Sequence, residues 1–263
     1  MKASDMTMGA ACRSAVVGLA AVVALAATAF NAYAGKNAGG YLVFYTNDSV
    51  VYTSDDEPYA GKSGVTCPED TQFPCPPYDG NNCSANKSIV QAAASSTKTN
   101  DYVVWWLLAG WPEETCPRLA ALQFGIQYDP AKVSINSSGT DADFELTTAR
   151  NGNDWPAPGS GTALTWNSPR TSHLKEVYWF TGYVYAEAAT FSVAIHPAGN
   201  SWPVFGDDDT PAGLDEIGNG YGGTPNVNFL PVLGLAGSLD GNNGDITPTR
   251  RQTWGGVKAL YGR

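Results

Sequence analysis

Four thiols in the middle of the chain are the groups best suited to covalent chemistry: Cys67, Cys75, Cys83 and Cys116. In an oxidising compartment an even set of thiols forms disulfides, and four of them allow three pairings. No Cys-x-x-Cys spacing occurs, so a zinc site built on cysteine alone is the weaker interpretation. We predict two disulfide bridges, whose pairing the sequence leaves open.

The fifth cysteine, Cys12, lies in a segment with the features of a signal peptide. A basic start precedes an uncharged apolar run at 15–30, and Ala32-Tyr33-Ala34 supplies the small-x-small pattern of a cleavage site. The run of 16 residues is short of the roughly 20 that a membrane-spanning helix needs. We predict cleavage after Ala34 and a secreted or cell-surface protein that begins at Gly35 and has no membrane anchor.

Two acidic, glycine-rich stretches could bind calcium, because hard cations take carboxylate and carbonyl oxygens in loops. The second stretch lacks the spacing of an EF-hand and its terminal Glu, and solvated acidic loops are the alternative. Calcium is the one cofactor that the sequence suggests. The candidate ligands are Asp207, Asp208, Asp209, Asp240, Asn242 and Asp245.

Catalytic motifs are missing from the sequence. The two histidines, His173 and His196, have no serine, cysteine or aspartate at a recognised spacing, and there is no Gly-x-Ser-x-Gly or His-Glu-x-x-His. Five glutamates could supply paired carboxylates for glycoside cleavage, but they form no constellation: Glu113, Glu114, Glu145, Glu176 and Glu187. We predict no catalytic residue and a protein that is not an enzyme.

The charge balance excludes one class of partner. The chain has 15 Lys and Arg against 25 Asp and Glu, a net charge of −10. A nucleic-acid surface needs clustered cations that replace phosphate counterions. We therefore expect an acidic extracellular surface that does not bind nucleic acid.

The elements that position these residues are strands. Apolar residues alternate with other residues in three segments, which predicts strands with one buried face. The apolar positions are Leu122, Phe124, Ile126 and Tyr128 in the first segment, Phe144 and Leu146 in the second, and Phe191 and Val193 in the third. Further strands are predicted at 41–46, 50–53, 102–109, 162–166 and 177–185. The pattern is typical of an all-β fold, an antiparallel β-sandwich of the Ig/cohesin-like or jelly-roll-like kind.

Between residues 61 and 99 the alternation stops. Prolines, Asp79-Gly80-Asn81-Asn82 and a small polar run cannot sustain a strand or a helix. We interpret 61–99 as an insertion in a single sandwich domain at 35–236, stapled by disulfides. Residues 237–263 are then a polar linker and a short tail, in which Trp254, Val257 and Tyr261 have helical spacing.

Two predicted strands, 102–109 and 177–185, are apolar on both faces, whereas a plain sandwich buries one. The rest of the chain, a second subunit or a sugar ring could cover the additional face. A neighbouring strand at 40–46 could likewise pair within its own domain or add to the sheet of another copy. The candidate assembly or glycan surface is Tyr102, Trp105, Trp106, Tyr178, Trp179 and Tyr183.

Residues 122–133, Leu-Gln-Phe-Gly-Ile-Gln-Tyr-Asp-Pro-Ala-Lys-Val, resemble the strand, Asp-Pro turn and strand of cohesin-like and other bacterial cell-surface sandwich modules. Trp155-Pro156, Gly159–Ala163 and His173–Phe180 are similar to uncharacterised secreted proteins of uncultured bacterial phyla. The ending Thr253–Tyr261, of a Thr-Trp-Gly-x-x-Lys type, resembles a tail on other exported proteins of those phyla, although Gly262 here separates Tyr261 from Arg263. The resemblance implies no known activity.

Together these features predict a non-catalytic extracellular structural or cell-surface protein that binds itself or a surface component and assembles into an oligomer or filament. A carbohydrate-binding module, with Trp and Tyr contacting a polysaccharide, is the alternative. A secreted hydrolase comes third.

Overall fold

The computed structural model describes residues 35–54, 59–69, 86, 89, 95–112, 115–185, 189–217 and 230–236. The chain divides between Tyr33 and Ala34, and all described residues belong to the second part. No helix in these ranges is long and apolar enough to cross a bilayer. The predicted signal peptide and the tail at 237–263 lie outside the described residues.

The described chain is built from strands, and every pairing between named strands is antiparallel. A single 3-10 turn, η1 (Ala198–Asn200), is also described. The strands are β1 (Tyr41–Thr46), β2 (Asp101–Gly110), β3 (Leu119–Tyr128), β4 (Val133–Gly139), β5 (Phe144–Thr148), β6 (Gly161–Arg170), β7 (Leu174–Val184), β8 (Ala189–Ala194), β9 (Val204–Gly206), β10 (Leu214–Glu216) and β11 (Val232–Leu235).

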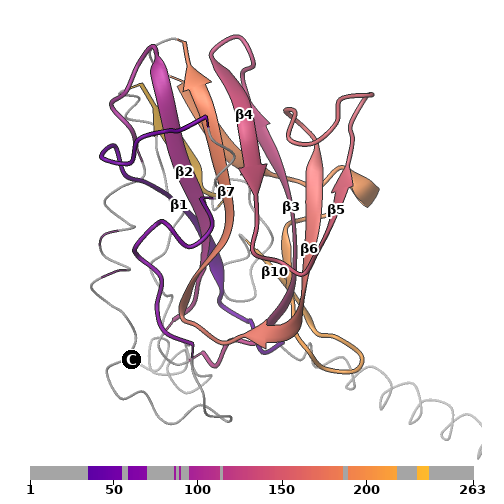
Figure 1. Cartoon of the computed structure of the whole chain (residues 1–263). Coiled ribbons are helices and arrows are strands. Elements are labelled where there is room, and N and C mark those ends of the chain that lie inside the picture. The colour runs from indigo at the N-terminus through magenta and orange to yellow at the C-terminus, as the bar shows by residue number, and fades with distance from the viewer. Residues whose placement is uncertain are drawn as a thin grey trace, which may run out of the picture. The chain divides into compact units, whose positions relative to one another are not determined.

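The strands form two sheets that face each other (Figure 1). Sheet A has the order β1-β2-β7-β4, and sheet B contains the path β10-β9-β3-β6-β5. In sheet B, β9 pairs with the first half of β3 and β8 pairs with the second half, while β11 lies beside β8. The prediction of an all-β antiparallel sandwich is therefore confirmed.

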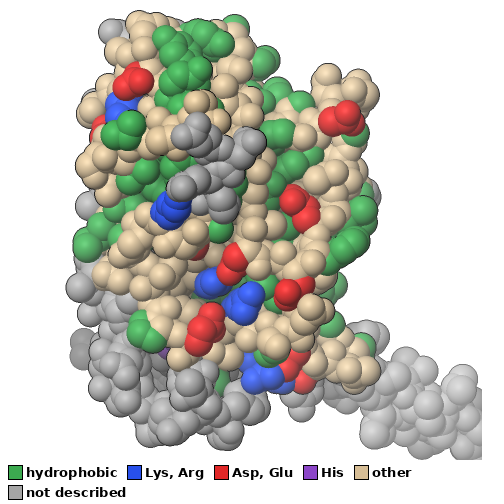
Figure 2. Space-filling view, viewed as in Figure 1, with side chains coloured by type: hydrophobic (Ala, Val, Ile, Leu, Met, Phe, Trp, Pro, Cys, Tyr) green, Lys and Arg blue, Asp and Glu red, His purple; other side chains and the backbone are tan. Residues whose placement is uncertain are grey.

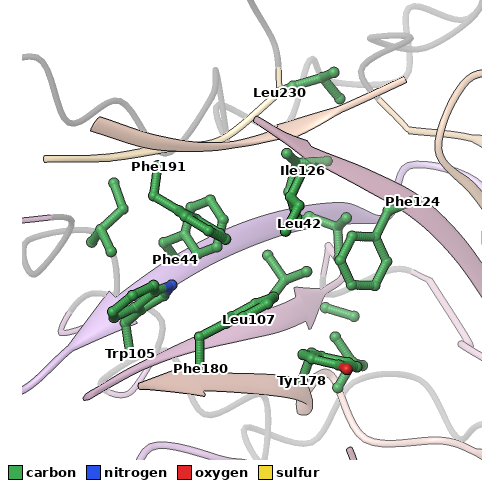
Figure 3. Packing of buried hydrophobic residues seen from close by; sticks show 14 of the residues in the cluster. Leu42, Phe44, Trp105, Leu107, Phe124, Ile126, Tyr178, Phe180, Phe191 and Leu230 are labelled. Atoms are coloured by element: carbon green, nitrogen blue, oxygen red, sulfur yellow. The ribbon is translucent and has the colours of Figure 1, made fainter. Parts of the chain in front are cut away.

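Aromatic side chains from both sheets fill the space between them, as Figure 3 shows. The ring of Phe191 on β8 packs 5.6 Å from Phe44 on β1, 5.2 Å from Trp105 on β2 and 4.9 Å from Phe180 on β7. The alternation predicted for β3 is confirmed, because Leu122, Phe124, Ile126 and Tyr128 all point into this core. Phe191 of sheet B therefore contacts one ring on each of three strands of sheet A.

The alternation predicted for β5 is reversed. Glu145 lies on the core side, where its carboxylate accepts hydrogen bonds from the hydroxyls of Tyr178 and Thr162, and Phe144 and Leu146 are exposed. Because β5 is an edge strand that pairs only with β6, the two buried hydroxyl groups decide which face turns inward.

Three further expectations are corrected or completed. Residues 50–53 form no strand, since Val51 is exposed and the Tyr52 ring stacks on Tyr102 from outside sheet A. Residues 41–46 pair with β2 of their own domain and not with the sheet of another copy. The short β9, β10 and β11 were not predicted, because three or four residues hold too little alternation to detect, and β4 was not predicted because its seven residues are mostly polar.

Replacing Phe191 with Ala should lower the free energy of unfolding by about 3–5 kcal/mol, because the cavity would lie between the rings of Phe44, Trp105, Phe180 and Tyr128. Phe144→Ala is the matched control, and its exposed ring should cost less than about 0.5 kcal/mol. Urea denaturation of both variants checks this. Similar losses at the two positions would contradict the two-sheet core.

Candidate interaction surfaces

The candidate platform of aromatic residues is mostly buried. Trp105 and Tyr178 belong to the core between the sheets, while Trp106 and Trp179 lie on the outer face of sheet A under other parts of the chain. As an open assembly or sugar-binding surface, these four residues were wrongly predicted. The chain itself covers the second apolar face, which was one of the three alternatives.

The cover is the segment 59–67. The Tyr59 ring packs 5.5 Å from the Trp179 ring, and the indole N–H of Trp106 donates to the Tyr59 carbonyl over 2.9 Å. Val65 and Cys67 complete this second cluster. Part of the segment predicted as an insertion is thus a lid on sheet A, and we call 59–67 the covering segment.

A buried carboxylate holds the covering segment in place. Glu176 on β7 accepts hydrogen bonds from the N–H groups of Gly61 at 2.8 Å and Ser63 at 3.4 Å. Burial raises the pKa of Glu176, and the two donated hydrogen bonds oppose that shift. This glutamate is therefore engaged in structure, although the sequence offered it as a candidate for acid–base chemistry.

Glu145 is engaged in the same way. It accepts from Tyr178 Oη at 2.9 Å and from Thr162 Oγ1 at 2.7 Å, and Trp155 Nε1 donates to Tyr178 Oη at 2.7 Å. Burial is the main cause that raises the pKa of Tyr178, and the Glu145 charge adds to it. Among the described residues these glutamates form no acid–base pair; Glu113, Glu114 and Glu187 lie outside them.

Four tyrosines remain accessible at one end of sheet A. Tyr52 stacks on Tyr102 at 4.4 Å, Tyr102 meets Tyr183 edge-on at 5.0 Å, and Tyr183 lies 4.9 Å from Tyr185, which is exposed. Figure 2 shows hydrophobic side chains gathered at the top of this face, over the ends of β2 and β7. Of the predicted surface, Tyr102 and Tyr183 survive as part of this tyrosine row.

No described segment covers the outer face of sheet B in the way that 59–67 covers the outer face of sheet A. Phe144, Leu146 and Leu214 are 58%, 59% and 68% exposed. Strand pairing places Phe144, Thr165, Ala121, Gly206 and Leu214 in one row across five strands. Large apolar side chains therefore lie at both rims of this face, and the residues between them have small side chains.

The same face is almost uncharged. A second row across the same strands consists of Leu146, Ala163, Gln123, Val204 and Glu216. Glu216 is the one ionisable residue in the two rows, in a chain with a net charge of −10. We call these two rows the open face of sheet B. The sequence missed it because Phe144 and Leu146 were assigned to the core.

A shallow hollow of about 420 Å³ adjoins the open face over β8. It is lined by apolar residues of β8 and β11 and by Gln127, Arg150, Ser192 and Asn200. These polar groups include one cation and no carboxylate, so the hollow holds no acid–base pair.

The acidic residues at 207–209 are paired within the chain. Asp208 forms an ion pair with Arg118, Asp209 lies 2.5 Å from Lys36 Nζ, and Asp207 accepts the Gly213 N–H at 2.7 Å. The Arg118 guanidinium lowers the pKa of Asp208 to about 2. No cluster of three metal-binding side chains occurs within the described ranges. Calcium at Asp207, Asp208 and Asp209 therefore gains no support, and Asp240, Asn242 and Asp245 lie outside the described residues.

Of the two histidines, His196 is buried, with 2% of its surface exposed. Its Nδ1 accepts the N–H of Ala198 at 3.2 Å, and its Nε2 has no hydrogen-bond partner among the described residues. Desolvation lowers the pKa of His196. His173, which is half-buried, lies at the start of β7, where its carbonyl accepts the Trp111 N–H.

Two of the four predicted half-cystines are described. Cys67 is buried in the covering segment, and Cys116 is half-buried. No bond joins two described sulfur atoms, and Cys75 and Cys83 lie outside the described ranges. The pairing, and the stapling of the whole insertion, stay predictions.

Comparison with known proteins gives a remote likeness. The sequence matches no family model and no curated protein. A cohesin module from the Clostridium perfringens ATCC13124 family 33 glycoside hydrolase is 6% identical over 45% of this chain and 80% of its own, with a TM-score of 0.33. A type II cohesin domain from the Acetivibrio cellulolyticus cellulosome is 11% identical over 54% and 90%, with a TM-score of 0.36.

A third cohesin, the sixth of Acetivibrio cellulolyticus scaffoldin B in complex with a Cel5 dockerin, is 12% identical over 47% of this chain and 87% of its own, with a TM-score of 0.35. The matched structures are cohesin modules, the group that residues 122–133 resemble.

Removing the ring of Tyr59 should expose Trp179. We expect Tyr59→Ala to increase acrylamide quenching of tryptophan fluorescence and to cost about 2–4 kcal/mol, the range for deleting a large buried side chain. Tyr102→Ala is the matched control, because the ring pairs that its half-exposed side chain forms within the described residues are with Tyr52 and Tyr183. Equal quenching of the two variants would contradict the covering role of 59–67.

Buried His196 should make the fold sensitive to mild acid. Its pKa is lowered in the folded state, so its contribution to stability is complete above about pH 6.5, the value in the unfolded chain, and is lost as the pH falls toward the folded value. His196→Asn keeps an acceptor for the Ala198 N–H and removes the titration. Between pH 7.5 and 5.5 the unfolding free energy should fall more steeply in the wild type, by at most about 1.4 kcal/mol per pH unit. Parallel pH profiles would contradict this.

Proposed function

We propose that this chain is a non-catalytic extracellular interaction domain that binds a second copy of itself through the open face of sheet B. The observation that carries the proposal is the contrast between the two outer faces. Sheet A is covered by its own chain at 59–67, whereas sheet B presents Phe144, Leu146 and Leu214 to solvent. Exposed apolar patches with polar surroundings mark interaction sites.

Charge supports a second copy as the occupant. Two chains of net charge −10 repel each other over most of their surfaces. The open face has Glu216 as its one ionisable residue, so repulsion between copies is weakest there. Interface centres are in general depleted of charged residues, because burying an unpaired charge is costly.

Shape supports a two-fold pair. In an isologous interface the same patch is used twice, and residue i of one copy meets residue j of the other. With the two-fold axis over Ala121 at the centre of the row, Phe144 of each copy lies against Leu214 of the other, so both rims of the face are buried in apolar contacts. At about 3.3 Å per residue and about 4.8 Å between strands, the 31 residues of the five strands give about 500 Å², below the about 800 Å² per partner of a stable complex. We expect a dimer of modest affinity.

The self-association test uses the mature chain from Gly35 onward. In sedimentation velocity, the average mass of the wild type should rise with concentration over about 1–200 μM, a range that suits an interface of this size. The double variant Phe144→Asp with Leu214→Asp should stay monomeric, because it places two charges in each copy of the face. Val51→Asp is the matched control, since Val51 is 74% exposed but lies outside the open face. A wild type that is monomeric throughout, or an equal effect of Val51→Asp, would contradict the proposal.

A second candidate function is carbohydrate binding by the tyrosine row. Tyrosine rings can stack on sugar rings, and exposed Tyr185 ends the row. Affinity electrophoresis in soluble polysaccharides should then show retardation that Tyr185→Ala weakens and Phe144→Ala leaves unchanged. Equal migration with and without polysaccharide would remove this candidate.

A further inference from the structure

The first residues after the predicted cleavage site lie against two carboxylates. The Gly35 N–H donates to Asp215 Oδ1 at 2.9 Å, the Asn37 N–H donates to Asp215 Oδ2 at 3.1 Å, and the Lys36 N–H donates to Asp207 Oδ2 at 3.3 Å. Three consecutive main-chain donors therefore bind two acidic side chains that lie about 170 to 180 residues away in sequence.

Asn37 fixes this segment in the fold. It is fully buried, its side-chain amide donates to the Arg118 carbonyl at 3.2 Å, and its Oδ1 accepts the Arg118 N–H at 2.9 Å. Its own carbonyl accepts from Trp111 Nε1 at 3.3 Å. Because Asn37 is held on three sides, Gly35 has a defined position two residues earlier.

Asp215 lacks a cationic partner among the described residues. The nearby Lys36 and Arg118 side chains bind Asp208 and Asp209, while the bonds to Asp215 come from main-chain N–H groups. Burial raises the pKa of Asp215, and the charge of Asp207 raises it further. A half-buried carboxylate next to another acid is costly unless a positive charge pairs with it.

We propose that cleavage between Ala34 and Gly35 creates that positive charge, and that Asp215 is the binding site for the new α-ammonium group of Gly35. A signal peptidase hydrolyses the peptide bond with one water molecule. The C–N bond breaks, the oxygen of water joins Ala34 as a carboxylate, and the Gly35 nitrogen becomes an amine that is protonated near neutral pH. A neutral N–H donor 2.9 Å from Asp215 thereby becomes a cationic donor in the same place.

The space around Gly35 fits this role. A Cβ atom on residue 35 would lie 2.4 Å from Asp215 Oδ2, so the carboxylate can approach the terminal residue closely only when that residue is glycine. An extra residue before Gly35 restores a neutral amide and moves the amine by about 3.8 Å, the distance between neighbouring Cα atoms. The site therefore distinguishes the correctly cleaved chain from one that is a single residue longer.

The test compares two chains that differ by one residue: the mature chain beginning at Gly35, released from a fusion partner without a scar, and the same chain beginning at Ala34. We expect the Gly35 chain to melt about 3–8 °C higher, the shift expected for one partly buried, charge-assisted bond in a domain of this size. In Asp215→Asn the difference should vanish. In the matched control Asp208→Asn it should persist, since Asp208 pairs with Arg118.

A chemical modification gives a second test that does not depend on whether the Asp215→Asn variant folds. Selective acetylation of the α-amine of the folded Gly35 chain removes the charge and should lower the melting temperature to that of the Ala34 chain. Equal melting temperatures of the two chains, or a difference that persists in Asp215→Asn, would overturn the proposal. So would an exported protein whose N-terminal sequence starts elsewhere than Gly35. None of these outcomes depends on self-association through sheet B.

Discussion

Strands β1, β2 and β7 of sheet A are apolar on both faces, and much of the remaining structure follows from the need to keep both faces dry. The inner face packs on sheet B through Trp105, Phe180 and Phe191. The outer face carries Trp106 and Trp179, two large rings that water would otherwise contact. A sandwich of two sheets has no third layer, so an irregular segment has to supply one.

The covering segment meets this requirement through a small number of specific contacts. Tyr59 packs against Trp179 and its carbonyl accepts the Trp106 indole N–H, while the Glu176 carboxylate binds two N–H groups of the segment. Irregular backbone near a buried surface is stable only when its polar groups find partners. Glu176 supplies such partners from β7, at the cost of keeping a carboxylate away from water.

Sequence patterns predicted the elements whose faces differ along the strand itself. β3 is an example, because Leu122, Phe124 and Ile126 alternate with polar residues and do point inward. Patterns failed where a distant group decides the outcome. Nothing near Trp106 in sequence shows that Tyr59 will cover it, and the inward turn of Glu145 depends on the hydroxyls of Tyr178 and Thr162. The open face was hidden by the same error, since an exposed Phe144 requires an inward Glu145.

The N-terminal segment connects sheet B with sheet A. Residues 35–37 bind the carboxylates of Asp207 and Asp215 beside β10 at one edge of sheet B, and the chain then enters β1 at the edge of sheet A from Tyr41 onward. The segment thus links the two sheets at a place where the core rings of Trp111 and Phe205 also pack against each other. An interaction that holds Gly35 in place also strengthens the link between the two sheets. For that reason a single charge at Gly35 can stabilise the whole sandwich rather than one end of the chain.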